Sequence, residues 1–217
     1  MRCAMKKNRY RNILTGIGLA IVLAQLAGCS ATELEDRCFP MLAVVDYRLE
    51  QVEFMYGFPE LSQKDNTDMD EAKVDAPLTQ GVDFAEALDS YNGQLDKKAD
   101  CNHLKVLLIS EKMFDEQKLC GEMLDYLQET EIFPRNVYVC VTADVGAVLD
   151  TAEGLPTDLG SYLEKFLQNH EAENSVELTT LGTVLDETEN HVKTLSLPYL
   201  VVEEGAIRWE GVYRVRM

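Results

Sequence analysis

The sequence predicts an α/β fold, a mixed β-sheet with helices packed on it and antiparallel hairpins at its ends. Two observations support this prediction. First, short apolar runs typical of buried strands, at 105–110 and 136–142, alternate with longer segments whose apolar residues recur every three or four positions, as on one face of a helix. Second, hairpin patterns precede and follow this alternation. A repeated strand-helix order of this kind favours a sheet covered by helices.

The first 28 residues have the pattern of an export signal. Five basic residues and no acidic residue occur up to Asn12, and the apolar run that follows, 13–27, is short for a membrane-spanning helix. The run ends in Leu-Ala-Gly-Cys at 26–29, the bacterial lipobox, in which the cysteine receives a diacylglycerol. We therefore expect cleavage before Cys29, lipidation of its thiol and attachment to the outer face of a membrane. The competing interpretation is an uncleaved signal anchor with a coincidental cysteine.

The rest of the chain divides into a stalk and one domain. Residues 29–40 are expected to form a polar, acidic stalk, and residues 41–217 a single α/β domain. The strands at 106–109 and 137–141 are expected to be parallel neighbours joined by a right-handed crossover. The predicted elements are, in chain order, strands at 41–48 and 52–56, an acidic loop at 59–80, a helix at 82–95, a strand at 105–110, a helix at 115–128, a strand at 136–142, helices at 145–151, 158–170 and 180–190, and strands at 199–202 and 206–215.

The charge of the chain excludes some partners. There are 38 acidic and 20 basic residues, a net charge of −18, and five of the basic residues lie in the export segment. A surface this acidic repels nucleic acid and anionic lipid headgroups, so membrane attachment is expected to come from the lipid on Cys29. Solubility is the simpler explanation for most of the acidic residues.

The cysteines and histidines predict no cofactor or metal site. Four cysteines follow Cys29, without C-x-x-C spacing, and two of them, Cys120 and Cys140, fit buried apolar positions. Export would permit disulfides, but these positions favour free thiols. The pair Cys101-x-His103 offers only two metal ligands, so a histidine hydrogen-bonded at a strand entrance is the preferred interpretation. The other histidines and the tryptophan are explained by helix capping, at His170 and His191, and by edge-strand packing, at Trp209.

Motifs that would identify an enzyme are missing from the sequence. It contains no P-loop, no G-x-S-x-G and no H-E-x-x-H, so no catalytic residue is predicted. The acidic loop alternates like a calcium loop at 66–70, but Glu71 stands where an EF-hand needs glycine and Pro77 where it needs glutamate. A solvated acidic loop is therefore preferred over a calcium site.

The segment His-Leu-Lys-Val-Leu-Leu-Ile-Ser-Glu at 103–111 is one of several that match a known family in order. Together these segments resemble the Ger(x)C family of spore germination lipoproteins, in which a similar segment forms a strand. The resemblance covers nearly the whole chain after the export signal. The other segments lie at 28–36, which includes the lipobox cysteine, and at 42–47, 136–139, 161–165, 180–182, 198 and 211–213.

The resemblance implies a non-enzymatic, membrane-anchored lipoprotein subunit of a nutrient germinant receptor that acts in spore germination. Family members act on the spore inner membrane with two integral membrane subunits, of the A and B types. Their N-terminal α/β domain precedes further C-terminal domains, and we expect this sequence to represent the N-terminal domain. Cys29, the lipid attachment point, is the one site residue that the resemblance carries over.

Two other functions remain open at the level of sequence. The first is a stand-alone lipid-anchored protein that binds a solute or a cation through the acidic loop. The second is an exported enzyme, which rests only on the α/β architecture and therefore on a fold that hosts many chemistries.

Overall fold

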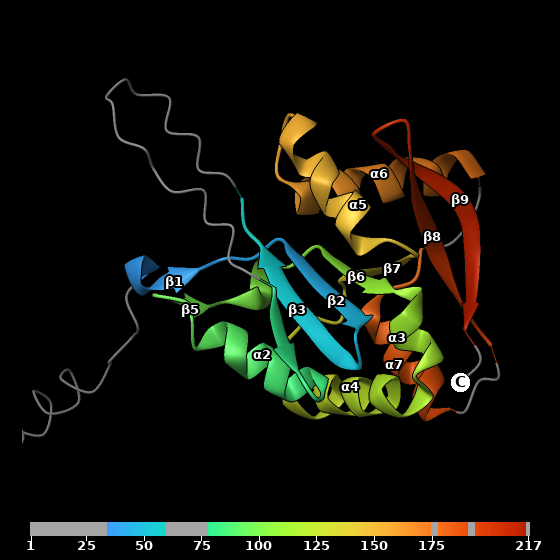
Figure 1. Ribbon diagram of the computed structural model, residues 1–217. Coiled ribbons are helices and arrows are strands. Elements are labelled where there is room, and N and C mark those ends of the chain that lie inside the picture. The colour runs from blue at the N-terminus through green and yellow to red at the C-terminus, as the bar shows by residue number, and fades with distance from the viewer. Residues whose placement is uncertain (1–33, 60–77, 175–177, 191–193, 216–217) are drawn as a thin grey trace, which may run out of the picture. The chain divides into compact units, whose positions relative to one another are not determined.

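The computed structural model describes residues 34–59, 78–174, 178–190 and 194–215 (Figure 1). The expected export signal, Cys29, most of the acidic loop and His191 lie outside these residues. The chain divides into two units, 1–36 and 37–217. In the first unit only a 3-10 turn, η1 (Leu34–Asp36), is described. The second unit begins at Arg37, within the stalk expected at 29–40.

The second unit is built on a mixed seven-stranded sheet, which confirms the predicted fold class. Its strand order is β4-β3-β2-β6-β7-β8-β9. The neighbours among β2, β6, β7 and β8 are parallel, and the outer pairs β2–β3, β3–β4 and β8–β9 are antiparallel. The bounds are β2 (Leu42–Arg48), β3 (Gln51–Gly57), β4 (Thr79–Gly81), β6 (Val106–Ser110), β7 (Tyr138–Thr142), β8 (Leu195–Glu203) and β9 (Ala206–Val215). A separate two-stranded parallel sheet pairs β1 (Arg37–Cys38) with β5 (Lys98–Ala99).

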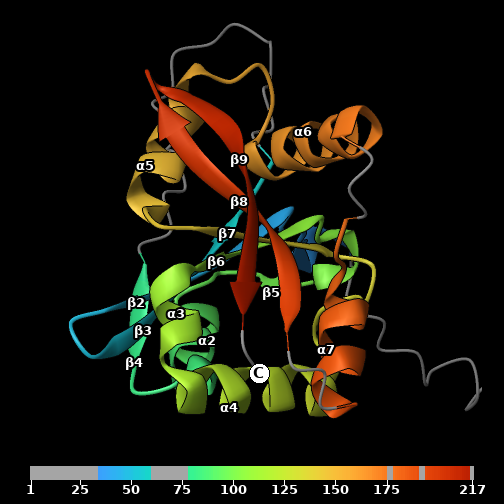
Figure 2. The same ribbon diagram turned by 90° about the vertical axis from the view of Figure 1, so that its right-hand side faces the viewer.

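Six α-helices in the described residues cover both faces of the seven-stranded sheet (Figures 1 and 2). One face packs against α2 (Phe84–Asn92), α3 (Glu111–Asp115), α4 (Gln117–Thr130) and α7 (Leu181–Glu189). The opposite face packs against α5 (Val145–Asp150) and α6 (Leu159–Asn174). Two short 3-10 turns, η2 (Cys101–His103) and η3 (Thr151–Gly154), complete the elements. Each face of the sheet therefore has its own apolar core, and the unit has three layers.

The central strands explain why the sequence pattern found the sheet. Every residue of β6 is buried, because alternate side chains enter the two cores, Leu107 and Ile109 on one face and Val106 and Leu108 on the other. Parallel strands covered by helices on both faces are apolar without interruption. The expected parallel pairing is confirmed, with Val106 opposite Tyr138. Polar caps start the helices that follow, since Ser110, Asp144 and Thr180 each accept a backbone N–H from the first turn.

Several elements differ from the sequence prediction, including β1 and β5, two-residue strands that the pattern did not reveal. β4 lies at the end of the predicted acidic loop and consists of three residues, too short for a pattern to reveal; the buried Thr79 hydroxyl holds it by donating to the Ala87 carbonyl at 2.7 Å. The helix expected at 115–128 is α4, Gln117–Thr130, and an unpredicted short helix, α3, precedes it, separated by Glu116, whose backbone leaves helical geometry (φ −84°, ψ 70°). β8 begins at Leu195, four residues before the expected start, and continues through Pro198 with a register shift at Tyr199 and Leu200.

Two helical glycines have opposite surroundings. A Cβ at Gly160 in α6 would lie 2.6 Å from the backbone carbon and oxygen of Met41, just before β2. A Cβ at Gly121 in α4 would meet nothing within 4 Å. The absence of a side chain at Gly160 therefore lets α6 approach the sheet closely, whereas Gly121 only adds freedom to the unfolded chain.

The substitution Gly160→Ala is expected to lower the free energy of unfolding by about 1–3 kcal/mol, because the methyl group meets rigid backbone. Gly121→Ala is the matched control and should raise it by up to about 1 kcal/mol, the usual difference in helix propensity. Urea unfolding followed by circular dichroism measures both. An equal response of the two variants would contradict the close approach.

Candidate functional site

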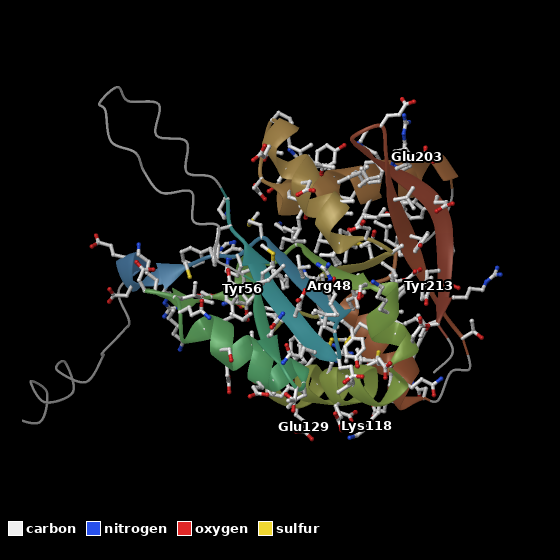
Figure 3. All side chains as sticks on the ribbon, viewed as in Figure 1. Arg48, Tyr56, Lys118, Glu129, Glu203 and Tyr213 are labelled. Atoms are coloured by element: carbon white, nitrogen blue, oxygen red, sulfur yellow. The ribbon has the colours of Figure 1, made fainter. Side chains whose placement is uncertain are left out.

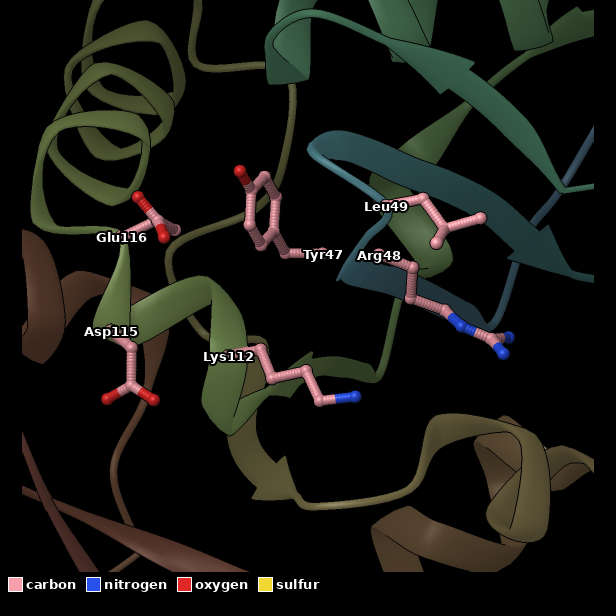
Figure 4. Close-up of a pocket in the computed structure, with 6 residues that line it drawn as sticks. All are labelled: Tyr47, Arg48, Leu49, Lys112, Asp115 and Glu116. Carbon is pink, nitrogen blue, oxygen red and sulfur yellow. The ribbon is translucent and has the colours of Figure 1, made fainter.

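From the carboxyl ends of the neighbouring strands β2 and β6, the chain continues toward opposite edges of the sheet. After β2 the chain turns to β3 on one side, whereas after β6 it passes through α3 and α4 to β7 on the other side. In open α/β sheets, ligands bind outside the carboxyl ends of the strands at such a point. A hollow of about 440 Å³ lies here, at the ends of β2 and β6, lined by Tyr47, Arg48, Leu49, Lys112, Asp115 and Glu116 (Figure 4).

Hydrogen bonds from backbone N–H groups to side-chain oxygens fix the end of β2 beside this hollow. The Tyr47 N–H lies 2.8 Å from Asp46 Oδ1 and 3.3 Å from Ser110 Oγ. The same Ser110 oxygen accepts the Met113 N–H at 3.3 Å, which caps α3. One buried hydroxyl therefore joins the end of β2 to the start of the helix that follows β6. This bond keeps the two walls of the hollow in register.

The hollow carries charges of both signs. The Tyr47 ring lies between the side chains of Glu116 and Arg48, and the charged ends of Arg48 and Lys112 point to the same side, away from Asp115 (Figure 4). Desolvation, together with the nearby carboxylates of Glu116 and Glu50, raises the pKa of Tyr47. Tyr47 is therefore a neutral phenol at physiological pH and is able to donate a hydrogen bond. Such a shallow, mixed-charge surface is suited to contact with a polar ligand or a partner protein.

The turn beside the hollow is strained. Leu49 (φ 50°) and Glu50 (φ 62°) connect β2 to β3 with both residues in the left-handed region. This two-residue turn favours Asn-Gly, and other side chains in that conformation cost roughly 1–3 kcal/mol each. Leu49 is also 91% exposed. The turn thus places an apolar side chain in solvent, beside the charged side chains of the hollow.

A second, smaller hollow of about 240 Å³ lies at the small sheet. Here Arg37 Nη1 and Asp100 Oδ2 form an ion pair at 2.7 Å. The hydrogen bond from Arg37 and a further one from the Asn102 N–H lower the pKa of the Asp100 carboxyl. These contacts attach β1 to η2 and explain why the compact unit begins at Arg37. Their role is structural.

The cysteines are placed as the sequence suggested. The four cysteines in the described residues are free, and Cys120 and Cys140 are buried. Cys101 is buried as well, and its thiol donates to the Tyr56 hydroxyl at 3.2 Å. Burial raises the pKa of Cys101 to about 11 and that of Cys120 to about 12. The thiol of Cys38 is partly exposed, with a pKa that is raised by burial and by Asp96.

The two described histidines, His103 and His170, lie in different surroundings. His103 is exposed, and its ring meets Phe39 edge-on at 5.3 Å, whereas Cys101 points into the core. Within the described ranges, no three His, Cys, Asp or Glu residues form a group able to hold a metal. His170 lies inside α6, which continues to Asn174, so the interpretation as a terminal cap is wrong. Its ring stacks on Trp209, with centroids 5.9 Å apart, and Trp209 packs on the core at the edge strand as predicted.

The hollow itself was not found from the sequence, because its walls come from residues far apart in the chain. Arg48 and Lys112 become neighbours only when β2 pairs with β6. A signal was present, however: the apolar runs of both strands end in polar residues, Asp46-Tyr47-Arg48 and Ser110-Glu111-Lys112. Neighbouring parallel strands that end in this way mark the edge at which ligands bind. Cys29, the predicted lipidation site, lies outside the described residues. No described helix is long and apolar enough to cross a membrane.

The fold and the hollow together define a three-layer α/β domain with a polar surface at the carboxyl ends of its parallel strands. A family model described as the spore germination protein N-terminal domain matches residues 30–202. Because this match covers most of the chain, the chain belongs to that family, which confirms the resemblance to Ger(x)C proteins and supports a role in spore germination. Comparisons with curated proteins and with solved structures gave no significant match.

Replacing the strained turn should stabilise the protein. The double variant Leu49→Asn, Glu50→Gly is expected to raise the free energy of unfolding by about 1–3 kcal/mol, because both new residues accept positive φ. The control is Glu204→Asn in the turn between β8 and β9, where Gly205 already takes one of the two positive angles. It should give a smaller gain. Urea unfolding measures both, and a destabilised double variant would show that the Leu49 and Glu50 side chains stabilise the turn.

The four described thiols should differ in reactivity. With a pKa of about 11, Cys101 is about one part in a thousand thiolate at pH 8, and burial also blocks the reagent. We expect iodoacetamide to modify Cys38 first, and Cys101, Cys120 and Cys140 only after unfolding in urea. Peptide mass spectrometry at successive times measures the order. Rapid modification of Cys101 in the native protein would contradict its buried contact with Tyr56.

Proposed function

We propose that this protein is a lipid-anchored, non-enzymatic subunit of a nutrient germinant receptor. In this proposal a diacylglycerol on Cys29 holds the domain on the outer face of the spore inner membrane. There the domain acts with integral membrane subunits of the A and B types during germination.

One observation carries this proposal. The family match begins at residue 30, directly after Cys29. The lipobox pattern, which is independent of the match, places the start of the mature protein at Cys29. The matched domain therefore starts where the lipobox predicts that the mature protein begins, which supports the proposal.

The charge of the domain fits a lipid anchor. With 38 acidic against 20 basic residues, the chain gains little from anionic headgroups. Stable anchoring takes two acyl chains or one chain with a basic patch, and a diacylated cysteine supplies the two chains. In this arrangement the lipid provides membrane affinity, and the protein surface is free for contacts with other subunits.

The hollow at the β2–β6 edge is the described surface best suited to such a contact. It combines the exposed Leu49 with two basic side chains, Arg48 and Lys112, in an otherwise acidic protein. An apolar side chain beside charges that can pair across an interface is typical of a protein contact. The strained turn holds Leu49 in place for it.

The substitution Cys29→Ala tests the anchor and the partners together. In sporulating cells, the wild-type protein should sediment with the membrane and bring down multi-spanning receptor subunits in a pull-down. The Cys29→Ala variant should be absent from the membrane fraction and should recover no such subunits. Cys38→Ala is the matched control and should behave as wild type, because Cys38 is a free thiol of the folded domain. Membrane fractionation followed by pull-down and mass spectrometry measures both properties.

Two results would contradict the proposal in different ways. Membrane attachment that survives Cys29→Ala would remove the lipid anchor. A wild-type protein that is membrane-bound but recovers no multi-spanning subunit would remove the receptor role, and a solitary binding function would replace it.

A further inference from the structure

A row of polar side chains crosses the sheet beside the hollow, on the face that packs against α5 and α6. Pairing places Glu53 directly opposite Gln80 on one side and Asp46 on the other. Residues directly opposite one another project from the same face of a sheet. Ser110 and Thr142 continue the row, because Val45 pairs with Ile109 and Ser110 pairs with Thr142.

Two members of this row are buried carboxyl groups. Asp46 is 6% exposed and Glu53 is 7% exposed, so both are more than nine-tenths buried. Glu53 Oε1 accepts a hydrogen bond from Gln80 Nε2 at 2.8 Å. Its second oxygen, Oε2, is buried and has no hydrogen-bond partner. Asp46 Oδ1 accepts the Tyr47 N–H at 2.8 Å.

This arrangement is unfavourable for the protein alone. Like charges directly opposite in an antiparallel pair destabilise a sheet. A buried carboxylate oxygen without a partner costs free energy, and buried charges are normally paired or bound to a metal. Asp46 and Glu53 take no part in the ion pairs Arg37–Asp100, Lys105–Glu164, Lys118–Glu122 and Arg135–Asp186 of the described residues. Arg48 follows Asp46 on the same face, but its side chain is exposed.

We propose that a divalent cation of the Ca²⁺ type binds between Asp46 and Glu53. Two facing carboxylates match the charge of one divalent ion, and Glu53 Oε2 supplies a ligand that has no other partner. Rotation of the Gln80 side-chain amide would add a neutral oxygen, and water completes the shell of such ions. Donor sets made only of oxygen favour Ca²⁺ and Mg²⁺ over zinc.

The position of this site gives it a definite structural effect. It joins β2, β3 and β4 at one of the two antiparallel ends of the sheet, and Asp46 immediately precedes Tyr47 of the hollow. The net charge of −18 raises the local concentration of cations. Asp46 and Glu53, the two carboxylates of the site, belong to β2 and β3 and not to the predicted acidic loop at 59–80, and the site does not depend on the receptor role.

The test compares the full chain, purified in detergent, with the variant Glu53→Gln, in which one carboxylate becomes a neutral amide of the same shape. Thermal unfolding is recorded in EDTA and in millimolar CaCl₂. We expect calcium to raise the wild-type Tm by several degrees, since it binds the folded state only. Glu53→Gln should melt higher than wild type in EDTA, because one buried charge is removed, and should gain little from calcium.

Glu129→Gln is the control, since Glu129 is exposed on α4 (Figure 3). It should respond to calcium like wild type. Equal calcium shifts in wild type and Glu53→Gln would place binding elsewhere, including the acidic loop, and would overturn the proposal. If Glu53→Gln does not fold, calorimetric titration of wild type with CaCl₂ and MgCl₂ decides: binding of about one ion that is lost in Asp46→Asn supports the site, and a flat titration of the wild type overturns it.

Discussion

The burial of β6 on both faces is the constraint on which the rest of the structure depends. Because all five of its residues are buried, helices must cover the sheet on both sides, and β2 and β7 must flank it to satisfy its backbone. The strand can become polar only where it ends. There Ser110 caps α3 and accepts the Tyr47 N–H, so the same position that closes the core also shapes the hollow.

The parts of the fold that follow from continuous patterns could be predicted. β6 and β7 are uninterrupted apolar runs, and α2 has its buried Phe84, Leu88 and Tyr91 at helical spacing. β4 and β5 could not, because two or three residues carry no period and are held by partners distant in the chain. The helix α3 was missed for a related reason, since its five residues, Glu111–Asp115, are too few to show a helical period.

The candidate sites show the same division. The hollow requires the pairing of β2 with β6, which brings together residues more than sixty positions apart, such as Arg48 and Lys112. The facing of Asp46 and Glu53 could have been predicted more easily from the sequence. Asp46 lies three residues before Leu49 and Glu53 three residues after Glu50, so a two-residue turn places them opposite each other. Acidic residues inside two paired strands were a signal that composition, with 38 acids in the chain, concealed.

The edges of the sheet bear on whether copies of the domain can pair edge to edge. An open strand edge can recruit the same edge of another molecule, and lipid anchoring would concentrate copies in two dimensions. Here one edge, β4, offers three residues. The other, β9, has a register shift against β8 and carries the exposed charges Arg208, Glu210 and Arg214. Both edges therefore discourage growth into a continuous intermolecular sheet, which would let many copies crowd together without fibre formation.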